Sequence, residues 1–156
     1  MFTGCKSQPN EEVYISDFYN IHEEYKDAWG NVGKYDISLP YIHCDSKSAK
    51  KLNQTIKNEY KDLVDSLDEA KEEGYTLPYT KISYDVYTHS NLLSLVIKEE
   101  VEAEYPRYKV YHFDSKTKKR VSNKKLYKKY NISQKDMKVW AAQAFDQEYA
   151  NEYYDN

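Results

Sequence analysis

The histidines and cysteines are the residues from which this chain could build a metal site or a nucleophilic centre. They do not have the spacing of metal ligands, and the sequence has no HExxH or HxH pattern and no glycine-rich phosphate loop. His43 and Cys44 are neighbours in a predicted strand, where successive side chains point to opposite faces, so they cannot act as a pair. We therefore predict no metal site, no cofactor and no catalytic centre. The residues considered are Cys5, His22, His43, Cys44, His89 and His112.

His112 and Asp114 are the alternative to that prediction. They lie two residues apart in a predicted strand, so their side chains share a face and could hydrogen bond. A glycan-modifying enzyme would need such a pair to converge in a pocket. Asp114 also opens a predicted turn, where an aspartate commonly accepts backbone N–H groups. We favour the structural interpretation and keep the catalytic one as the second hypothesis.

A run of cations follows Asp114 and could bind an anionic ligand. One interpretation is a solvated loop and helix face, and the other is a ridge that faces an anionic polymer or a membrane surface. The chain as a whole carries a net charge of −3 and its arginines are Arg107 and Arg120, which argues against a nucleic-acid partner. The candidate ridge consists of Lys116, Lys118, Lys119, Arg120, Lys124, Lys125, Lys128 and Lys129.

A glutamate-rich stretch precedes this run and has no catalytic spacing that we can identify. We interpret its carboxylates as charges that stop an exposed strand from pairing with another molecule. The stretch contains Glu99, Glu100, Glu102 and Glu104.

The first residues are typical of the end of a bacterial lipoprotein signal. Phe2-Thr3-Gly4 precede Cys5, and the polar residues after it suit a flexible tether over residues 1–12. Four residues are too few for an export signal, so either a longer precursor was cut or the match is due to chance. We favour the first explanation and predict a lipid anchor on Cys5, which places the protein outside the cytoplasmic membrane.

The elements that must position these residues begin with a long helix. Apolar residues recur at steps of three and four over residues 46–73, and Asp45, Ser46 and Gly74 are suitable caps. A coiled coil is the competing interpretation, but strands on both sides favour a helix that covers a sheet. The apolar stripe consists of Ala49, Leu52, Ile56, Tyr60, Leu63, Leu67 and Ala70.

Strands are expected on both sides of this helix. Residues 34–41 alternate in polarity, and Pro40 indicates an edge or a bulge. Residues 11–32 have no clear period and could form a lead-in strand or a short helix. After Pro78 we expect a hairpin, a further strand over residues 108–113 and a brief pairing at 120–122. A short helix and a capped C-terminal helix opening at Ser133, with Met137, Trp140, Ala141, Ala144 and Phe145 inward, complete the prediction. The fold class is α+β: an antiparallel sheet packed against one long helix, with a further C-terminal helix, as one domain over residues 13–156.

The chain contains 18 tyrosines and four phenylalanines. A tyrosine-lined binding surface is one interpretation, because the ring offers an apolar face and a hydrogen-bonding tip. We favour the other, in which biased codon usage places tyrosine at core positions.

Several segments match one family pattern in order over residues 34–130. They are Tyr35-Asp36-Ile37-Ser38-Leu39-Pro40-Tyr41-Ile42, Leu52-Asn53 with Ile56, Tyr84-Asp85-Val86, Asn91-Leu92-Leu93-Ser94-Leu95, Tyr111-His112-Phe113-Asp114, Thr117-Lys118-Lys119, Val121-Ser122 and Leu126-Tyr127. Together they resemble the extracytoplasmic domain shared by PdaC-type peptidoglycan deacetylases and RsiV-type anti-sigma factors. The chain departs from that pattern at residues 98–107, where a Gly-Gly-Ala-His turn is usual, and at Lys118, where glycine is usual.

The resemblance implies a non-catalytic cell-envelope module that binds or senses a wall component or an envelope protein. In the anti-sigma factors this domain binds lysozyme, so a lysozyme-like partner is one expectation. The alternatives are an accessory domain or truncated form of a peptidoglycan- or glycan-modifying enzyme, and a cytosolic protein-interaction domain. We expect contact with the membrane only through the lipid anchor, and we make no prediction of oligomeric state.

Overall fold

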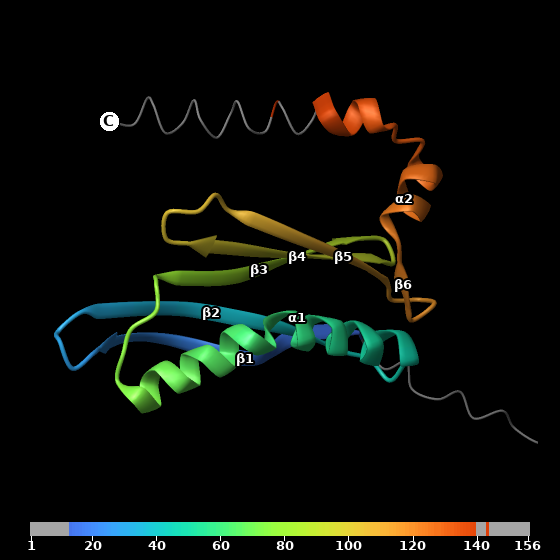
Figure 1. Ribbon diagram of the computed structural model, residues 1–156. Coiled ribbons are helices and arrows are strands. Elements are labelled where there is room, and N and C mark those ends of the chain that lie inside the picture. The colour runs from blue at the N-terminus through green and yellow to red at the C-terminus, as the bar shows by residue number, and fades with distance from the viewer. Residues whose placement is uncertain (1–12, 140–142, 144–156) are drawn as a thin grey trace, which may run out of the picture. The chain divides into compact units, whose positions relative to one another are not determined.

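The computed structural model describes residues 13–139 and 143, and it divides the chain into two compact units, residues 1–120 and 121–156. The predicted α+β class is confirmed: a six-stranded sheet in the order β1 to β6 is accompanied by a long helix, α1 (Lys47–Glu73), which lies along one face of the sheet (Figure 1). The strands are β1 (Tyr14–Lys26), β2 (Val32–His43), β3 (Thr80–His89), β4 (Leu92–Val101), β5 (Arg107–Asp114) and β6 (Lys119–Val121).

One strand pair departs from the predicted antiparallel sheet. Strands β2 and β3 are parallel, whereas β1–β2, β3–β4 and β4–β5 are antiparallel. The reason is the length of α1, whose 27 residues span about 40 Å and return the chain to the end of the sheet where β2 began. Strand β3 therefore starts beside the start of β2.

Strand β1 occupies the region for which the sequence showed no period. It pairs with β2 from Tyr14 opposite His43 to Lys26 opposite Val32, and its register shifts between Asp17 and Tyr19. This bulge lies where Asp17 meets Pro40, which has no N–H to donate, so the bulge predicted at Pro40 is confirmed. The extra residue also changes which positions face the core, and this change hides the alternation expected of a strand.

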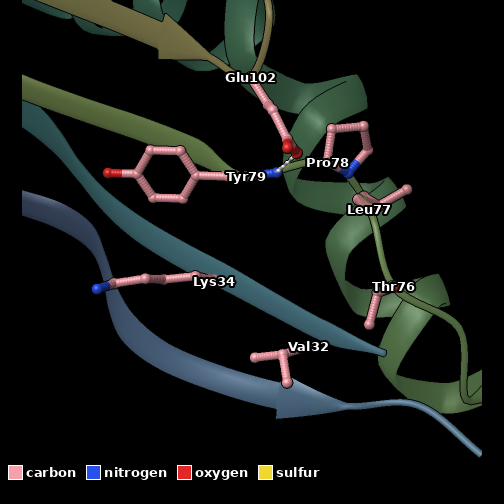
Figure 2. A pocket seen from close by; sticks show the side chains of 7 residues that line it. All are labelled: Val32, Lys34, Thr76, Leu77, Pro78, Tyr79 and Glu102. Carbon is pink, nitrogen blue, oxygen red and sulfur yellow. Dashed lines mark hydrogen bonds between the residues drawn. The ribbon is translucent and has the colours of Figure 1, made fainter. Parts of the chain in front are cut away.

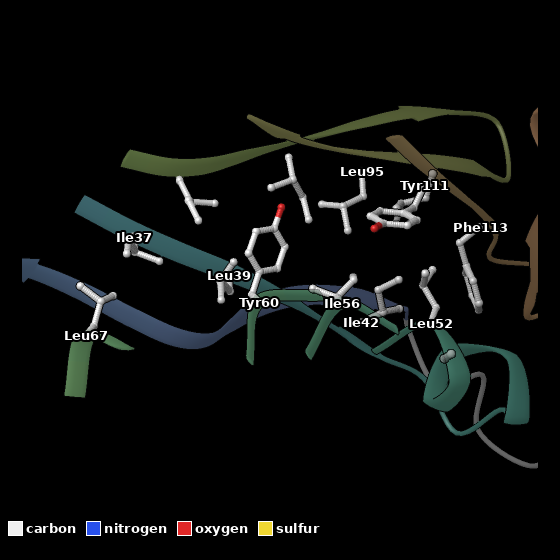
Figure 3. Packing of buried hydrophobic residues seen from close by; sticks show 14 of the residues in the cluster. Ile37, Leu39, Ile42, Leu52, Ile56, Tyr60, Leu67, Leu95, Tyr111 and Phe113 are labelled. Atoms are coloured by element: carbon white, nitrogen blue, oxygen red, sulfur yellow. The ribbon is translucent and has the colours of Figure 1, made fainter. Parts of the chain in front are cut away.

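Helix α1 begins and ends where its caps predict. The Ser46 side chain accepts the Ala49 N–H, and Gly74, at φ 77°, donates its N–H to the Ala70 carbonyl. The predicted stripe is buried except at Leu63, which is partly buried. Figure 3 shows the stripe packed against β2, β4 and β5, so the helix covers the sheet of its own chain. The labelled core residues are Ile37, Leu39, Ile42, Leu52, Ile56, Tyr60, Leu67, Leu95, Tyr111 and Phe113.

Asn53 of α1 replaces a missing strand partner. Strand β2 pairs with β3 only from Tyr35 to Ile37, so the backbone of Ile42 has no strand on that side. The buried Asn53 amide donates to the Ile42 carbonyl and accepts from the Ile42 N–H, both at 2.9 Å. A buried backbone group without a partner would cost free energy, so Asn53 explains the polar residue within an apolar stripe.

The remaining elements follow the predicted turns. The hairpin between β3 and β4 turns at Ser90, and the β5–β6 turn places Lys118 at φ 54°, a conformation that favours glycine. In the second unit, α2 (Asn123–Tyr130) is capped by Ser122, and Ser133 and Asp136 form the predicted capping box. Residues 134–139 are helical. Trp140, Ala141, Ala144 and Phe145 lie outside the described residues, as does Cys5.

Candidate functional site

Three connections meet at one end of the sheet. They are the β1–β2 turn, the segment from α1 to β3 and the β4–β5 turn (Figure 1). The Ala28 N–H donates to the Gly74 carbonyl at 3.4 Å, and the Glu102 N–H donates to the Tyr79 carbonyl at 3.0 Å, so backbone hydrogen bonds join all three. We call this region the aromatic end and define it as Trp29, Val32, Lys34, Thr76, Leu77, Pro78, Tyr79, Glu102 and Tyr105.

The β1–β2 turn presents Trp29 from a rigid loop. The buried Asp27 carboxylate accepts the N–H groups of Trp29 and Asn31 and the Asn31 side-chain amide, at 2.8 to 2.9 Å. Burial alone would favour the neutral acid, but these hydrogen bonds hold the pKa of Asp27 below its usual range. The Trp29 side chain is nevertheless 77% exposed, and Tyr105 across the end is 79% exposed. Two large exposed rings on anchored turns are typical of a recognition surface.

An open pocket of about 560 Å³ lies at the same end (Figure 2). Its apolar wall comes from Val32, Leu77, Pro78 and the ring of Tyr79, and its polar groups are those of Lys34, Thr76 and Glu102. The volume is within the range of small-molecule sites. The Glu102 carboxylate accepts the Tyr79 N–H at 3.4 Å, a long bond that leaves its other oxygen available to a ligand.

This arrangement suits a ligand that has a flat apolar face with hydroxyl groups around it. Aromatic rings pack against apolar ligand faces, while a carboxylate accepts hydrogen bonds and an ammonium donates them. Glu102 supplies the carboxylate of the pocket lining.

Glu99 has a different role from the one predicted for the glutamate-rich stretch. Strand β4 lies between β3 and β5, so it is not an exposed edge, and the Glu99 side chain is only 9% exposed. Its carboxylate accepts the Tyr60 hydroxyl at 2.6 Å and the Lys109 ammonium at 2.7 Å. Burial favours the neutral acid, but these partners hold the pKa of Glu99 below its usual range. The prediction that Glu99 stops an exposed strand from pairing is therefore wrong, and Glu99 instead joins α1 to the sheet.

A second tyrosine–carboxylate contact lies beside the first. The Tyr111 hydroxyl donates to Glu59 of α1. Burial is the main cause that raises the pKa of Tyr111, and this hydrogen bond is the second. Burial and Glu99 likewise raise the pKa of Tyr60. Both hydroxyls therefore stay protonated at neutral pH. They act as donors that hold the helix against β4 and β5.

Among the histidine and cysteine candidates, His43, Cys44 and His112 make contacts within the fold. The Asp114 carboxylate accepts the Thr117 N–H at 2.7 Å, which is the turn role that we favoured. His112 hydrogen bonds through Nδ1 with the Ser94 hydroxyl at 2.9 Å, and burial lowers its pKa. His43 bonds the Ser16 hydroxyl through Nε2, while Cys44 packs against the core. In residues 13–139 and 143, no group of three His, Cys, Asp or Glu side chains is placed to hold a metal ion.

The structure divides the predicted cationic ridge between the two units. Lys116, Lys118, Lys119 and Arg120 lie in the β5–β6 turn and the start of β6, within the first unit. The other four, Lys124, Lys125, Lys128 and Lys129, lie on α2 in the second unit. That all eight form one ridge stays a prediction.

Sequence reasoning missed Trp29 and the pocket. The turn signal was present, since an aspartate followed by Gly30 and Asn31 is typical of a loop that accepts its own N–H groups. The pocket had no local signal because its lining comes from three separate segments.

No protein-family model matches the chain, and no curated protein matches it in sequence. Within the part of the chain that the structure covers, no helix is long and apolar enough to cross a membrane.

Proposed function

We propose that this chain is a non-catalytic binding module of the cell envelope that recognises the glycan of the wall through its aromatic end. In this proposal a lipid on Cys5 holds the module outside the membrane. The observation that carries it is the open pocket with an aromatic and apolar wall, which lies at the same end of the sheet as Trp29 and Tyr105, two exposed rings on anchored turns.

A glycan fits the chemistry of this end better than a small metabolite does. Sugar rings have apolar C–H faces that pack on aromatic side chains, and their hydroxyls bond to carboxylate and ammonium groups. Lys34 and Glu102 supply these groups at the pocket. The pocket is open, so it can accept a residue within a long chain as well as a free end. An envelope protein that presents similar groups, such as a lysozyme-like partner, is the second candidate.

Co-sedimentation of the full chain with purified peptidoglycan sacculi tests this function. We expect retention that persists at high salt, because short-range packing and hydrogen bonds to uncharged sugar hydroxyls are little screened. The double variant Trp29→Ala, Tyr105→Ala should weaken retention about tenfold, which corresponds to about 1.4 kcal/mol. Tyr87→Ala is the matched control, since this tyrosine is 60% exposed but lies near the end of β3 at the opposite end of the sheet.

Two results would contradict the proposal. One is the absence of any retention, which would direct the search to a protein partner with lysozyme as the first probe. The other is equal retention of the double variant and the Tyr87→Ala control, which would show that the aromatic end does not contact the wall.

A further inference from the structure

The opposite end of the sheet gathers cations from two segments that are far apart in the sequence. Strand β2 ends there and α1 begins, and β5 ends there before the β5–β6 turn (Figure 1). The first turns of α1 bring three lysines, and the turn with the start of β6 brings four more cations. We call this set the cationic end: Lys47, Lys50, Lys51, Lys116, Lys118, Lys119 and Arg120.

Two contacts show that the two segments lie side by side. The Arg120 N–H donates to the Ser48 hydroxyl of α1 at 2.7 Å. Asp45, just before the helix, forms an ion pair with Lys50 at 2.7 Å and also interacts with the charge of Lys118. All seven cations belong to the first unit, so their proximity does not depend on where α2 lies.

The two segments of the cationic end carry a net charge of +5. Residues 45–51 and 114–120 together hold seven cations and two carboxylates, Asp45 and Asp114. Asp114 accepts a backbone N–H of its own turn, and Asp45 forms an ion pair with Lys50. The whole chain has a net charge of −3, so positive charge is concentrated here against the overall sign. Such a concentration attracts anions over several ångströms.

We propose that the cationic end binds a flexible phosphodiester polymer such as poly(glycerol phosphate), in which a phosphate recurs every few backbone atoms. Lysine ammonium groups are compact point charges that contact single phosphate oxygens, and lysines three or four residues apart on a helix are about 5–6 Å apart at Cβ. A flexible polyanion can therefore lie across α1 and the turn and contact several lysines at once. The positive end of the α1 dipole adds to the same field.

The side chains at this end favour a polymer over a bilayer. Proteins that bind a membrane surface combine cations with apolar side chains that enter the interface. In residues 45–51 and 114–120 the apolar residue is Ala49, and it is fully buried. These two segments therefore offer charge without an exposed apolar side chain of their own to insert.

Binding of the full chain to purified poly(glycerol phosphate) tests this site. We expect the affinity to fall about tenfold or more between 50 and 200 mM salt, because bound phosphates release counterions. Lys47→Glu with Lys51→Glu, and separately Lys116→Glu with Lys119→Glu, should each weaken binding by about tenfold. These four side chains are exposed, and acidic residues suit the first turns of a helix, so the variants should fold.

The control must change the charge equally at another place. Lys26→Glu with Lys61→Glu does so on the end of β1 and the middle of α1, and it should change the affinity by less than about twofold. An equal loss in this control would show that net charge alone drives binding and would overturn the site. A loss confined to the Lys116 and Lys119 pair would equally overturn a site built from two elements.

Two further binding measurements distinguish the polymer from a membrane surface and this site from the aromatic end. Vesicles of phosphatidylglycerol and phosphatidylcholine should bind more weakly than the polymer, and tighter binding to vesicles would replace the polymer with a membrane surface. The double variant Trp29→Ala, Tyr105→Ala should bind the polymer normally. This site can therefore fail or succeed independently of glycan recognition at the aromatic end.

Discussion

The two ends of the sheet share one framework and differ in chemistry. The aromatic end has exposed rings, an open pocket and one side chain of each charge, Lys34 and Glu102, in its lining. The cationic end has seven cations and no exposed apolar side chain in the segments that form it. Contacts at the first act over short range and resist salt, whereas attraction at the second acts over long range and is screened. The strands and most of α1 form the framework that both ends share, and the candidate binding groups lie on the connections and on the first turns of α1.

The buried polar contacts that join α1 to the sheet also differ between the two ends, since one is neutral and the other includes a charge. Toward the cationic end, the neutral amide of Asn53 bonds the backbone of Ile42. Toward the aromatic end, the Tyr60 hydroxyl bonds the charged Glu99, which also contacts Lys109. The two ends should therefore respond differently to pH, although one core lies between them.

The largest expected effect comes from the core that both ends share. Ile56 is fully buried in the middle of α1, so Ile56→Ala should lower the free energy of unfolding by about 2 to 5 kcal/mol. Hydrogen exchange should then become faster at both ends together, because the helix and sheet unfold cooperatively. The exposed Gln54→Ala change serves as the control and should cost less than about 0.5 kcal/mol. Faster exchange at one end alone would show that the ends are separate folding units.

The next effect separates the two buried polar contacts by pH. Asn53→Ala leaves the Ile42 backbone groups unpaired, and Glu99→Gln removes the negative charge that faces Lys109. Each change should lower the free energy of unfolding by about 1 to 3 kcal/mol at pH 7. The pKa of Glu99 is lowered in the folded state, so its contribution is complete above the ordinary carboxyl value of 4.5 and is lost as the pH falls through the lowered pKa.

Urea denaturation between pH 3 and 7 measures this difference. The gap between the wild type and Glu99→Gln should shrink at acid pH, while the gap for Asn53→Ala should stay constant. A constant gap for Glu99→Gln would mean that its charge does not contribute to stability.

The smallest expected effect concerns the caps of α1, one at each end. Ser46→Ala removes the acceptor for the Ala49 N–H, and Gly74→Ala places a side chain at φ 77°, so each should cost about 1 kcal/mol. Hydrogen exchange should become faster in the first turn for Ser46→Ala and in the last turn for Gly74→Ala. Ser66→Ala, in the exposed middle of the helix, should change neither turn. Equal effects of both cap variants on both turns would contradict independent ends.

Much of the fold could be predicted from local patterns, and the errors have physical causes. The caps and stripe of α1, the β3–β4 hairpin and the capping box at Ser133 depend on residues close in sequence. Strand β1 could not be told from a short helix because its bulge changes which face its side chains point to. Glu99 was misread because its burial depends on Tyr60 and Lys109, which lie on other elements. The family resemblance and the anchor at Cys5 stay predictions.

Local patterns in the sequence predicted most elements of this protein, because helix periodicity, caps and strand alternation are set by contacts within about four residues. The run of cations after Asp114 can also be read from the sequence. Which segments meet depends on the tertiary structure. The parallel β2–β3 pair brings three connections together around a pocket, and the contact of Arg120 with Ser48 places the lysines of α1 beside the turn. These contacts between distant segments depend on strand order and register, which result from packing across the whole core and leave no local signal in the sequence.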